Sequence, residues 1–435
     1  MIWKMIYNTI GIAAIFTGFQ VASLFNAKIR QGILARKTAF RQLEEQLELV
    51  PDFTKRVWFH FTSVGEFEQA KPLIESIKGN AQIILTYFSP SVRPNVLEYP
   101  HCDAHTYLPL DTAINAKRLF NLIRPTVLVF SKFDIWPNLV WGAFDQGIPT
   151  VLIAGTLHQK SKRLHPIARS FFKQVHNKLT LHCVISESDA ERFKQLCGDD
   201  SQVEVTGDTR FDTVYNRAIT VKVDQFLLAQ SSFRYPVIIA GSTYIEEEEI
   251  LLQAYELLRC GETNGLLHLI VVPHEPTVEH IQKFCSKLDL LGFSYMLFSD
   301  LKSEMDLSGM EVIVIDTIGL LAELYKICDI AFVGGSFHGR VHNVMEPAAM
   351  AKPIVFGPRI ENSYEAGLLK ERHAAQQVYN ASEMADIFRE LICSSQLRQQ
   401  MGEVAKAVIV ENLGASQRSL AVSYTHLTLP TKRIV

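Results

Sequence analysis

Apolar residues in this chain gather in short runs that are separated by longer amphipathic stretches. The runs hold adjacent Val, Ile, Leu and Phe rather than alternating apolar and polar residues, which is typical of parallel strands covered on both faces. Stretches of helical periodicity lie between the runs and predict helices, as at Glu66–Lys78, Ile245–Arg259 and Thr277–Leu291. This alternation predicts doubly wound α/β sheets. The predicted strands are Val57–Val64, Gln82–Phe88, Thr126–Phe133, Thr150–Thr156, His182–Ser186, Val237–Gly241, His268–Pro273, Glu311–Ile315, Ile330–Gly334 and Pro353–Gly357.

The predicted strands form two sets, which a polar stretch from about Asp212 to Tyr235 separates. Each set has the size of one Rossmann-like domain. We therefore expect an N-terminal domain over 31–220 and a C-terminal domain over 221–420. Two such domains facing each other across a cleft make the GT-B glycosyltransferase architecture. Ligands of open α/β sheets bind at the carboxyl ends of the strands, so both domains would turn those ends toward the cleft.

The N-terminal segment Met5–Ala27 contains 23 residues and no charge. A helix of this length can cross a hydrocarbon core of ~30 Å, although several polar residues dilute the segment. Lys4 precedes it, and five basic residues follow it before the first acid, Glu44, which predicts that the next domain lies on the cytoplasmic side. We expect residues 1–30 to be an uncleaved membrane anchor that spans the bilayer or lies in one leaflet. A cleaved signal peptide would need a clearer cleavage site, and an amphipathic core helix is the remaining alternative.

The C-terminal residues change character abruptly. The stretch 423–435, SYTHLTLPTKRIV, resembles a translated cloning or adapter segment rather than native protein. Such segments are set aside when a fold is inferred from sequence.

Composition narrows the functional class. The chain has 435 residues, 48% of them hydrophobic, and 43 basic against 46 acidic residues give a net charge of −3. A nucleic-acid-binding protein usually carries a basic excess, so we expect no nucleic-acid partner. The 7 cysteines are scattered and form no CxxC pair, which suits a reducing compartment better than a disulfide framework.

Two candidate sites follow strands of the first set. The stretch 62–68, TSVGEFE, places Gly65 and Glu66 at a strand–helix junction, where a carboxylate can act as a general base toward a hydroxyl. The alternative role of Glu66 is that of a helix-start acid favoured by the helix dipole. The stretch 132–138, KFDIWPN, offers Lys132, Asp134 and Trp136 as acceptor contacts, although Trp136 can equally be a packing anchor.

Two further candidates follow strands of the second set. Gly241-Ser242-Thr243 precedes a helix whose free N–H groups could bind phosphate. The glutamates Glu246–Glu249 are expected to form a solvated helix face. The stretch 333–349, VGGSFHGRVHNVMEPAA, is a glycine-rich loop with two His, in which backbone N–H groups can approach phosphate and Glu346 can bind ribose hydroxyls. It matches neither the Walker nor the GxGxxG pattern, and its two His without paired carboxylates are weak evidence for a metal.

Taken in order, these pieces resemble the 3-deoxy-D-manno-oct-2-ulosonic acid (Kdo) transferases of lipopolysaccharide synthesis. The resemblance runs from the apolar N-terminus to about residue 400. It rests on the ordered set Ser63-Val64-Gly65-Glu66, Trp136-Pro137-Asn138, Gly241-Ser242-Thr243, Asp316-Thr317-Ile318-Gly319 before Tyr325, Gly334-Gly335-Ser336, His342-Asn343-Val344-Met345-Glu346-Pro347 and Phe356-Gly357-Pro358.

The resemblance implies a GT-B enzyme of the inner membrane that transfers Kdo from CMP-Kdo to a lipid A precursor, lipid IVA, with inversion. It implies that Glu66 is the general base and that no metal or other cofactor is needed, because helix N-termini and basic groups can stabilise the departing phosphate. Lys160, Lys162, Arg163 and Arg340 join Lys132 as basic groups that could meet the two acidic substrates. The acceptor contacts expected from the resemblance are Gly65, Lys132, Asp134 and Trp136. The donor contacts are Ser242, Thr243, His274, Gly319, Gly334, Gly335, Ser336, Asn343 and Glu346.

Three positions depart from the family pattern. Pro273-His274-Glu275-Pro276 lacks an arginine that many members carry, so His274 or another group would contact the donor phosphate. Ile318-Gly319-Leu320-Leu321 lacks the usual acid, and Asp134 stands where Glu is common.

Other functions are compatible with the same fold. A GT-B transferase could use a UDP-sugar on a membrane acceptor, and a UDP-sugar epimerase would need neither a lipid nor an anchor. A membrane-attached binding protein with an inactive site would not need the combination of Glu66 with the loop that leads to Glu346.

Overall fold

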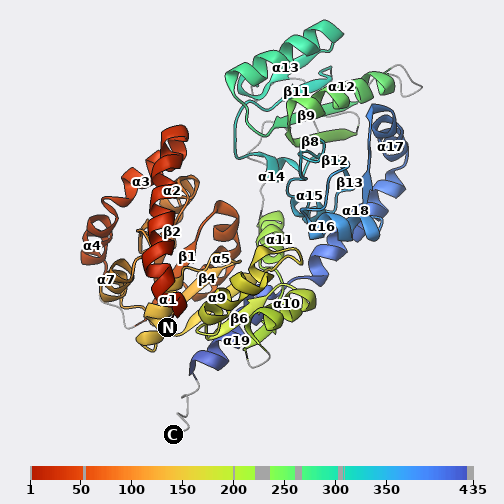
Figure 1. Ribbon diagram of the computed structural model, residues 1–435. Helices are drawn as coiled ribbons and strands as arrows, with labels where there is room; N and C mark the ends of the chain where they lie inside the picture. The colour runs from red at the N-terminus through yellow and green to blue at the C-terminus, as the bar shows by residue number, and fades with distance from the viewer. Residues whose placement is uncertain are drawn as a thin grey trace. The chain divides into compact units, whose positions relative to one another are not determined.

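The computed structural model describes residues 2–51, 55–198, 201–220, 236–259, 267–301, 307 and 309–428 (Figure 1). The chain divides into two compact units. Unit 1 comprises Met1–Thr213 and Gly414–Val435, and unit 2 comprises Val214–Leu413. The expected linker residues 221–235 and the end of the expected non-native tail, 429–435, lie outside the described residues.

Unit 1 is built on one parallel sheet of seven strands in the order β3-β2-β1-β4-β5-β6-β7. Apolar clusters pack on both of its faces, because alternate residues of each buried strand point to opposite sides. In β1, for example, Trp58 belongs to one cluster and Phe59 to the other. The strands are β1 Arg56–Phe61, β2 Gln82–Tyr87, β3 Ala104–Tyr107, β4 Val127–Ser131, β5 Thr150–Gly155, β6 Leu181–Val184 and β7 Val203–Val205.

Helices connect these strands in the manner of a doubly wound sheet. They are α5 Val64–Ile77, α6 Arg93–Leu97, α7 Ala113–Ile123, α8 Pro137–Asp145, α9 Pro166–His176 and α10 Glu187–Cys197, with short 3-10 turns η2 Pro90–Val92 and η3 Lys162–Leu164. The helices α3 Ala27–Arg36 and α4 Ala39–Leu49 precede β1. The helix α11 Arg210–Thr220 leads from unit 1 into unit 2.

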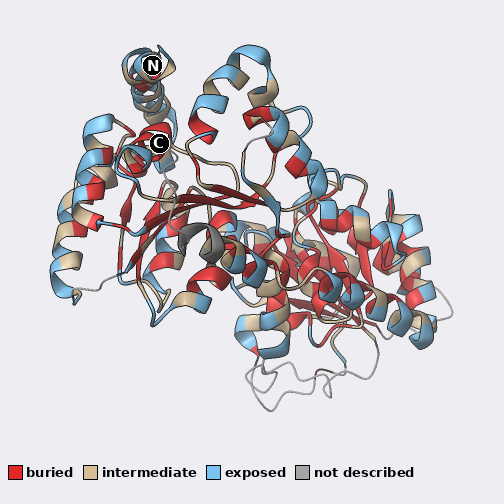
Figure 2. Cartoon of the chain, turned by 90° about the horizontal axis from the view of Figure 1, so that it is seen from below, coloured by how far each residue is buried: buried red, intermediate tan, exposed pale blue. Residues whose placement is uncertain are grey.

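Unit 2 repeats the plan with a second parallel sheet of seven strands in the order β10-β11-β9-β8-β12-β13-β14. Figure 2 shows the central strands of both sheets almost entirely buried. The strands are β8 Val237–Thr243, β9 His268–Pro273, β10 Tyr295–Leu297, β11 Val312–Val314, β12 Ile330–Val333, β13 Ile354–Phe356 and β14 Ala375–Gln377. The helices are α12 Ile245–Arg259, α13 Val278–Leu291, α14 Leu321–Leu324, α15 Met345–Ala349, α16 Tyr364–Glu371, α17 Ala381–Cys393 and α18 Ser395–Glu411, with η6 Phe298–Asp300.

The expected α/β class with two Rossmann-like sheets is confirmed, and each predicted strand is present. The strands that sequence patterns missed are β3, β7, β10 and β14, which lie at or beside sheet edges. They are only three or four residues long, and β10 has no fully buried residue. A continuous apolar run marks a strand that is covered on both faces, so short edge strands leave little trace in the pattern.

The uncharged N-terminal segment forms one long helix in three parts, α1 Ile2–Ile6, η1 Tyr7–Gly11 and α2 Ile12–Phe25, in which η1 is a π-helical turn. By length and composition, Ile2–Phe25 could cross a membrane, and most of it is not buried within the protein. Its first turns are nevertheless fixed to unit 1. The Tyr7 hydroxyl donates to Asp111 Oδ2 at 2.8 Å, and the Asn8 amide donates to Asn138 Oδ1 at 3.1 Å.

The end of the described chain returns to unit 1. Helix α19 Ala415–Thr428 follows Gly414, and residues 414–420, which the sequence interpretation assigns to the C-terminal domain, cluster with unit 1. The Asp212 carboxylate explains this placement, because it accepts hydrogen bonds from the backbone N–H groups of Gly414 at 2.7 Å and Ser416 at 2.8 Å.

Candidate active site

Each sheet has a switch point, where strand order reverses and open α/β sheets bind ligands. In unit 1, the order places β1 beside β4, and in unit 2 it places β8 beside β12. The expected site residues follow these four strands. Gly65 and Glu66 follow β1, and Lys132 follows β4. In unit 2, Ser242 and Thr243 end β8, and Gly334 follows β12.

Glu66 is the third residue of α5 and is 4% exposed. Its Oε2 accepts hydrogen bonds from the backbone N–H groups of Thr62 at 2.6 Å and Ser63 at 3.0 Å. With the Ser63 side chain, these bonds form a capping box, which fixes the start of the helix. The expected helix-start role is thus present. Within the described chain, however, Glu66 Oε1 makes no hydrogen bond, so one carboxylate oxygen is available for a proton.

The surroundings of Glu66 raise the pKa of its carboxyl above the ordinary value. Burial raises the pKa of this carboxyl and is the largest effect. The hydrogen bonds from Thr62 and Ser63 and the charge of Lys132 oppose this effect, whereas the charge of Asp134 adds to it. A carboxylate with a raised pKa is a stronger base than an ordinary glutamate, which suits proton abstraction from a hydroxyl.

Lys132 and Asp134 therefore lie close enough to Glu66 for their charges to shift its pKa. This is expected if the three residues belong to one site. Lys132 adopts φ of 68°, a left-handed conformation that is unusual for a residue with a side chain and that often marks functional loops. Arg163 joins the group, because its Nη2 lies 3.9 Å from Asp134 Oδ1. Burial lowers the pKa of Arg163, and the Asp134 charge counteracts that effect.

Trp136 serves as a packing residue and also carries an unused donor. Its ring stacks on Phe88 with centroids 5.0 Å apart and meets His60 edge-on at 6.3 Å. In the described part of the chain, its buried Nε1 has no hydrogen-bond partner, and neither has the buried hydroxyl of Thr62. Buried donors are normally satisfied, so an unpaired Nε1 beside the switch point is consistent with a ligand contact.

Gly65 leaves room beside Glu66. A Cβ atom at this position would meet no atom within 4 Å. The backbone conformation does not require glycine here, so the small residue keeps space open rather than enabling a turn.

The glycine-rich loop of unit 2 is organised by Glu247, which the sequence interpretation placed on a solvated helix face. That expectation is wrong for Glu247 and Glu248, which are 0% and 2% exposed. Glu247 accepts hydrogen bonds from the backbone N–H groups of Gly335 at 2.7 Å, Phe337 at 2.9 Å and Tyr244 at 3.2 Å. Burial raises the pKa of the Glu247 carboxyl, and these hydrogen bonds act against that rise.

This arrangement changes the role expected for Gly334 and Gly335. The N–H of Gly335 is bonded to Glu247, and the N–H of Gly334 donates to the Gly241 carbonyl at 2.9 Å, so neither is free for phosphate in this conformation. The glycines are needed for close packing instead. A Cβ on Gly334 would lie 2.5 Å from the Ser242 carbonyl oxygen, and one on Gly335 would lie 2.3 Å from that of Arg340.

Other expected donor residues hold the framework of this loop. The buried Ser336 hydroxyl accepts from the Gly357 N–H at 2.6 Å, and Asn343 Oδ1 accepts from the Met345 N–H at 3.1 Å. Thr243 donates to Glu248 at 2.8 Å, and the other oxygen of Glu248 pairs with His280 at 2.8 Å. The sequence pattern gave no sign of this buried network.

A cluster of aromatic rings lies over the start of α12 and joins three strand ends. Tyr244 stacks on His338 with centroids 4.2 Å apart, and His274 stacks on His342 at 4.4 Å. Burial, aided by the positive charges of neighbouring groups, lowers the pKa of His342 to about 4. Tyr244 was not predicted, although its place directly after Gly241-Ser242-Thr243 is a signal that could have found it.

Glu346 and Gly319 complete the expected donor residues. Glu346 is the second residue of α15, and its charge helps to raise the pKa of the buried Tyr325, after the larger effect of burial. Gly319 adopts φ of 91°, and a Cβ there would meet no atom within 4 Å. Both residues lie in unit 2, as does the Tyr244 and histidine cluster.

One group of possible metal ligands lies in unit 1. His176, His182 and Cys197 place their ligand atoms within 4.8 Å of one another. His176 Nδ1 and His182 Nε2 share a hydrogen bond of 3.1 Å, and His182 Nδ1 faces the Gln202 carbonyl at 3.3 Å. Burial lowers the pKa of both imidazoles. Two neutral histidines satisfy both of these hydrogen bonds. We therefore interpret the group as part of the packed core.

Residues 34–213 match the family model described as 3-Deoxy-D-manno-octulosonic-acid transferase (kdotransferase). Relatives that bear the name 3-deoxy-D-manno-octulosonic acid transferase include the following three. The Haemophilus influenzae protein is 28% identical over 84% of this chain and 85% of its own. The Aquifex aeolicus protein is 28% identical over 77% and 86%, and the Chlamydophila psittaci protein is 29% identical over 72% and 72%.

Solved structures share the two-sheet fold. The UDP-GlcNAc 2-epimerase of Neisseria meningitidis aligns with a TM-score of 0.59 and 15% identity, over 86% of this chain and 100% of its own. A glycosyltransferase from Rickettsia africae aligns with a TM-score of 0.58 and 10% identity, over 87% and 100%. At these identities the likeness concerns the fold alone, so the epimerase structure does not favour an epimerase activity.

Proposed function

We propose that this chain, as a member of the 3-deoxy-D-manno-octulosonic acid (Kdo) transferase family of glycosyltransferases, transfers Kdo from CMP-Kdo. The acceptor is the lipid A precursor lipid IVA. The observation that carries the mechanism is the buried Glu66 at the switch point of unit 1, with a raised pKa and an oxygen that makes no hydrogen bond within the described chain.

Glu66 Oε1 takes the proton of an acceptor sugar hydroxyl. The oxygen of that hydroxyl forms a bond to the anomeric carbon of Kdo, while the bond from that carbon to the CMP phosphate oxygen breaks and CMP leaves with the electron pair. Attack from the face opposite the leaving group inverts the configuration. The capping-box bonds of Oε2 hold the carboxylate in one orientation throughout, so little reorganisation is needed.

Basic groups in unit 1 meet the acidic acceptor. The charge of Lys132 lowers the pKa of Glu66, and Arg163 Nη2 lies 3.9 Å from Asp134 Oδ1. The positive charges of this site are therefore only partly neutralised. The indole N–H of Trp136 donates to an acceptor oxygen, and the lack of a partner for this N–H in the described chain supports the assignment.

The donor binds in unit 2. Because Glu247 occupies the loop amides, the CMP phosphate is recognised by side chains near the Tyr244 cluster rather than by the N–H groups of Gly334 and Gly335. His274 stands where an arginine is common in the family, and its ring is held against His342. Glu346 binds the ribose hydroxyls of CMP.

The N-terminal helix attaches the enzyme to the cytoplasmic face of the inner membrane. Large apolar side chains, among them Ile10, Phe16 and Leu24, are exposed along it. The bonds of Tyr7 and Asn8 to unit 1 hold its first turns against the folded domain, which favours a helix that lies in one leaflet over one that spans the bilayer.

The test of the mechanism is Glu66→Gln. Glutamine keeps an oxygen for the Thr62 and Ser63 N–H groups, so the fold is retained while the base is lost. Turnover of CMP-Kdo with lipid IVA should fall by about 10²–10⁴-fold, whereas CMP binding should stay as in the wild type. Mass spectrometry of the lipid product measures both the activity and the number of Kdo residues added. Undiminished turnover would remove Glu66 from the mechanism.

A further inference from the structure

We propose that the groove between the N-terminal helices and the ends of β2 and β3 binds an acyl chain of the phosphorylated lipid acceptor, an inference that rests on the proposed function. The groove belongs wholly to unit 1 and has a volume of about 650 Å³, within the range of about 300–1,000 Å³ that is typical of ligand pockets.

The wall of the groove is apolar and is built from two parts of the chain. Helices α2 and α3 supply Phe16, Phe19, Ile29 and Ile33, and the segment after β2 supplies Phe88. Phe19 lies against Phe88 with ring centroids 5.3 Å apart. Such a wall offers hydrocarbon contacts and few hydrogen bonds, as a lipid chain requires.

Helix α3 approaches η2 closely at Gly32, which lines the groove. A Cβ on the buried Gly32 would lie 2.8 Å from Arg36 Nη1 and 3.2 Å from Pro90 Cγ, so glycine lets α3 pack directly on η2. Arg36 is fixed there by donating to the backbone carbonyls of Leu108, at 2.9 Å, and Phe88, and its guanidinium lies 4.1 Å from the centre of the Phe88 ring.

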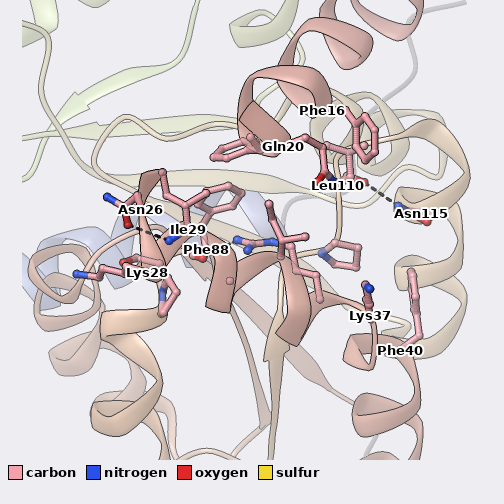
Figure 3. A pocket seen from close by; sticks show the side chains of 17 residues that line it. Phe16, Gln20, Asn26, Lys28, Ile29, Lys37, Phe40, Phe88, Leu110 and Asn115 are labelled. Atoms are coloured by element: carbon pink, nitrogen blue, oxygen red, sulfur yellow. Dashed lines mark hydrogen bonds between the residues drawn. The ribbon is translucent and has the colours of Figure 1, made fainter. Parts of the chain in front are cut away.

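The charges of the groove select an anionic lipid. Lys28, Arg36 and Lys37 line it, and among its described lining residues there is no Asp or Glu. Figure 3 shows Lys28 and Lys37 on opposite sides of the apolar wall that contains Ile29 and Phe88. An apolar lining with basic groups at its rim is complementary to an acyl chain whose headgroup bears phosphate.

The groove connects to the base through the ends of adjacent strands. The Ser89 N–H donates to the Thr62 carbonyl at 2.9 Å, and the Thr62 N–H donates to Glu66 Oε2 at 2.6 Å. Phe88 in addition stacks on Trp136. A lipid whose chain lies in the groove would therefore have its headgroup beside the residues proposed to meet the acceptor sugar.

Ile33→Trp tests the proposal because it fills the groove from a position that is half-buried in its wall. Leu34→Trp is the matched control, since Leu34 is the next residue of α3, is 54% exposed and does not line the groove. Transfer is measured with lipid IVA and with the same phosphorylated disaccharide freed of its acyl chains. For Ile33→Trp, kcat/KM should fall at least tenfold with lipid IVA and stay unchanged with the deacylated acceptor. Leu34→Trp should match the wild type with both.

A second measurement does not depend on transfer. Dodecyl phosphate, kept below the concentration at which it forms micelles, is titrated calorimetrically against the full chain. Each buried CH₂ is worth about a fourfold gain in affinity, so dodecyl phosphate should bind far more tightly than butyl phosphate. Ile33→Trp should abolish the difference and Leu34→Trp should keep it.

The outcomes separate the two proposals. Absence of transfer to either acceptor by the wild type, with dodecyl phosphate still bound in the groove, would overturn the proposed function and keep the groove as a lipid site. Transfer together with equal binding of both alkyl phosphates, or with equal effects of the two Trp variants, would overturn the groove proposal. Sedimentation with anionic vesicles completes the test, because a loss of vesicle binding specific to Ile33→Trp would identify the groove as a membrane contact instead.

Discussion

The carboxylate of Glu247 accepts the backbone N–H of Gly335 at 2.7 Å, across the switch point of unit 2. The same carboxylate also takes the N–H of Phe337. An acidic side chain thus occupies the place that a phosphate takes in many glycine-rich loops. The loop is held in shape by the protein itself, before any donor arrives.

Replacement of Glu247 tests this role. Glu247→Ala would leave the buried N–H groups of Gly335 and Phe337 without an acceptor, and unsatisfied buried groups cost about 1–3 kcal/mol each. The free energy of unfolding measured with denaturant should therefore fall by roughly 2–6 kcal/mol. Glu249→Ala is the control, because the Glu249 side chain is 53% exposed in its pair with Lys287. It should change stability by no more than about 0.5 kcal/mol. Equal effects of the two variants would refute the assignment.

The acid limb of the pH–rate profile should report the Glu66 carboxyl. Burial raises its pKa above the ordinary value, so activity should fall as the pH drops through that raised pKa and protonates the base. Asp134 adds to the rise and Lys132 opposes it. Asp134→Asn should consequently move the limb to lower pH, and Lys132→Met should move it to higher pH.

The profile is measured as kcat at saturating concentrations of both substrates, so that changes in binding do not enter. Glu68→Gln serves as a control. Glu68 lies on the same helix and pairs with Lys71, and neither residue is among the groups that shift the pKa of Glu66. Shifts of the same sign for Asp134→Asn and Lys132→Met would show that another group titrates.

Two glycines at corresponding strand ends should respond in opposite ways to the same substitution. A Cβ on Gly241 would lie 2.2 Å from the Tyr325 hydroxyl and 2.6 Å from Leu321 Cδ1, so Gly241→Ala should lower the free energy of unfolding by about 1–3 kcal/mol. A Cβ on Gly65 would meet nothing within 4 Å. Gly65→Ala should therefore keep or slightly raise stability, by up to about 1 kcal/mol.

The activity readout then distinguishes the two positions. If the space beside Gly65 receives the acceptor, Gly65→Ala raises the KM for lipid IVA and leaves the KM for CMP-Kdo unchanged. A Gly65→Ala enzyme with wild-type constants for both substrates would show that this space is not used.

Sequence patterns were sufficient to predict the strands that are covered on both faces, because burial imposes continuous apolar runs such as that of β4. They also placed Glu66, Lys132 and Asp134 after strand ends, and the structure brings these residues together, because β1 and β4 are neighbours at a switch point. Their roles in catalysis and acceptor binding stay predictions. They could not distinguish a solvated glutamate from a buried one. Glu247 and Glu249 lie in the same acidic run, and only the turn of α12 decides which faces the loop.

The attachment of the N-terminal helix is likewise invisible in a hydropathy pattern. Tyr7 and Asn8 read as polar interruptions of an apolar segment, whereas in the structure they bond to Asp111 and Asn138 of unit 1. Those partners lie more than 100 residues away, so no local signal marks the contact.

Tyr7→Phe should loosen the attachment of this helix to unit 1. The buried Asp111 carboxyl, whose pKa burial raises to about 6, would lose the Tyr7 hydroxyl and keep its contacts with α8. The hydroxyl stabilises the charged form, so its loss should raise the Asp111 pKa further. A carboxyl with a raised pKa in the folded state loses stability as the pH rises through that pKa. The destabilisation, about 1–3 kcal/mol, should thus be larger at pH 8 than at pH 5.

Hydrogen exchange of residues 2–25 gives the direct readout. Thr9→Val is the control, because among the described residues Thr9 bonds only to carbonyls of its own helix. Unchanged protection of this helix at pH 8 would show that the hydroxyl does not hold it to unit 1.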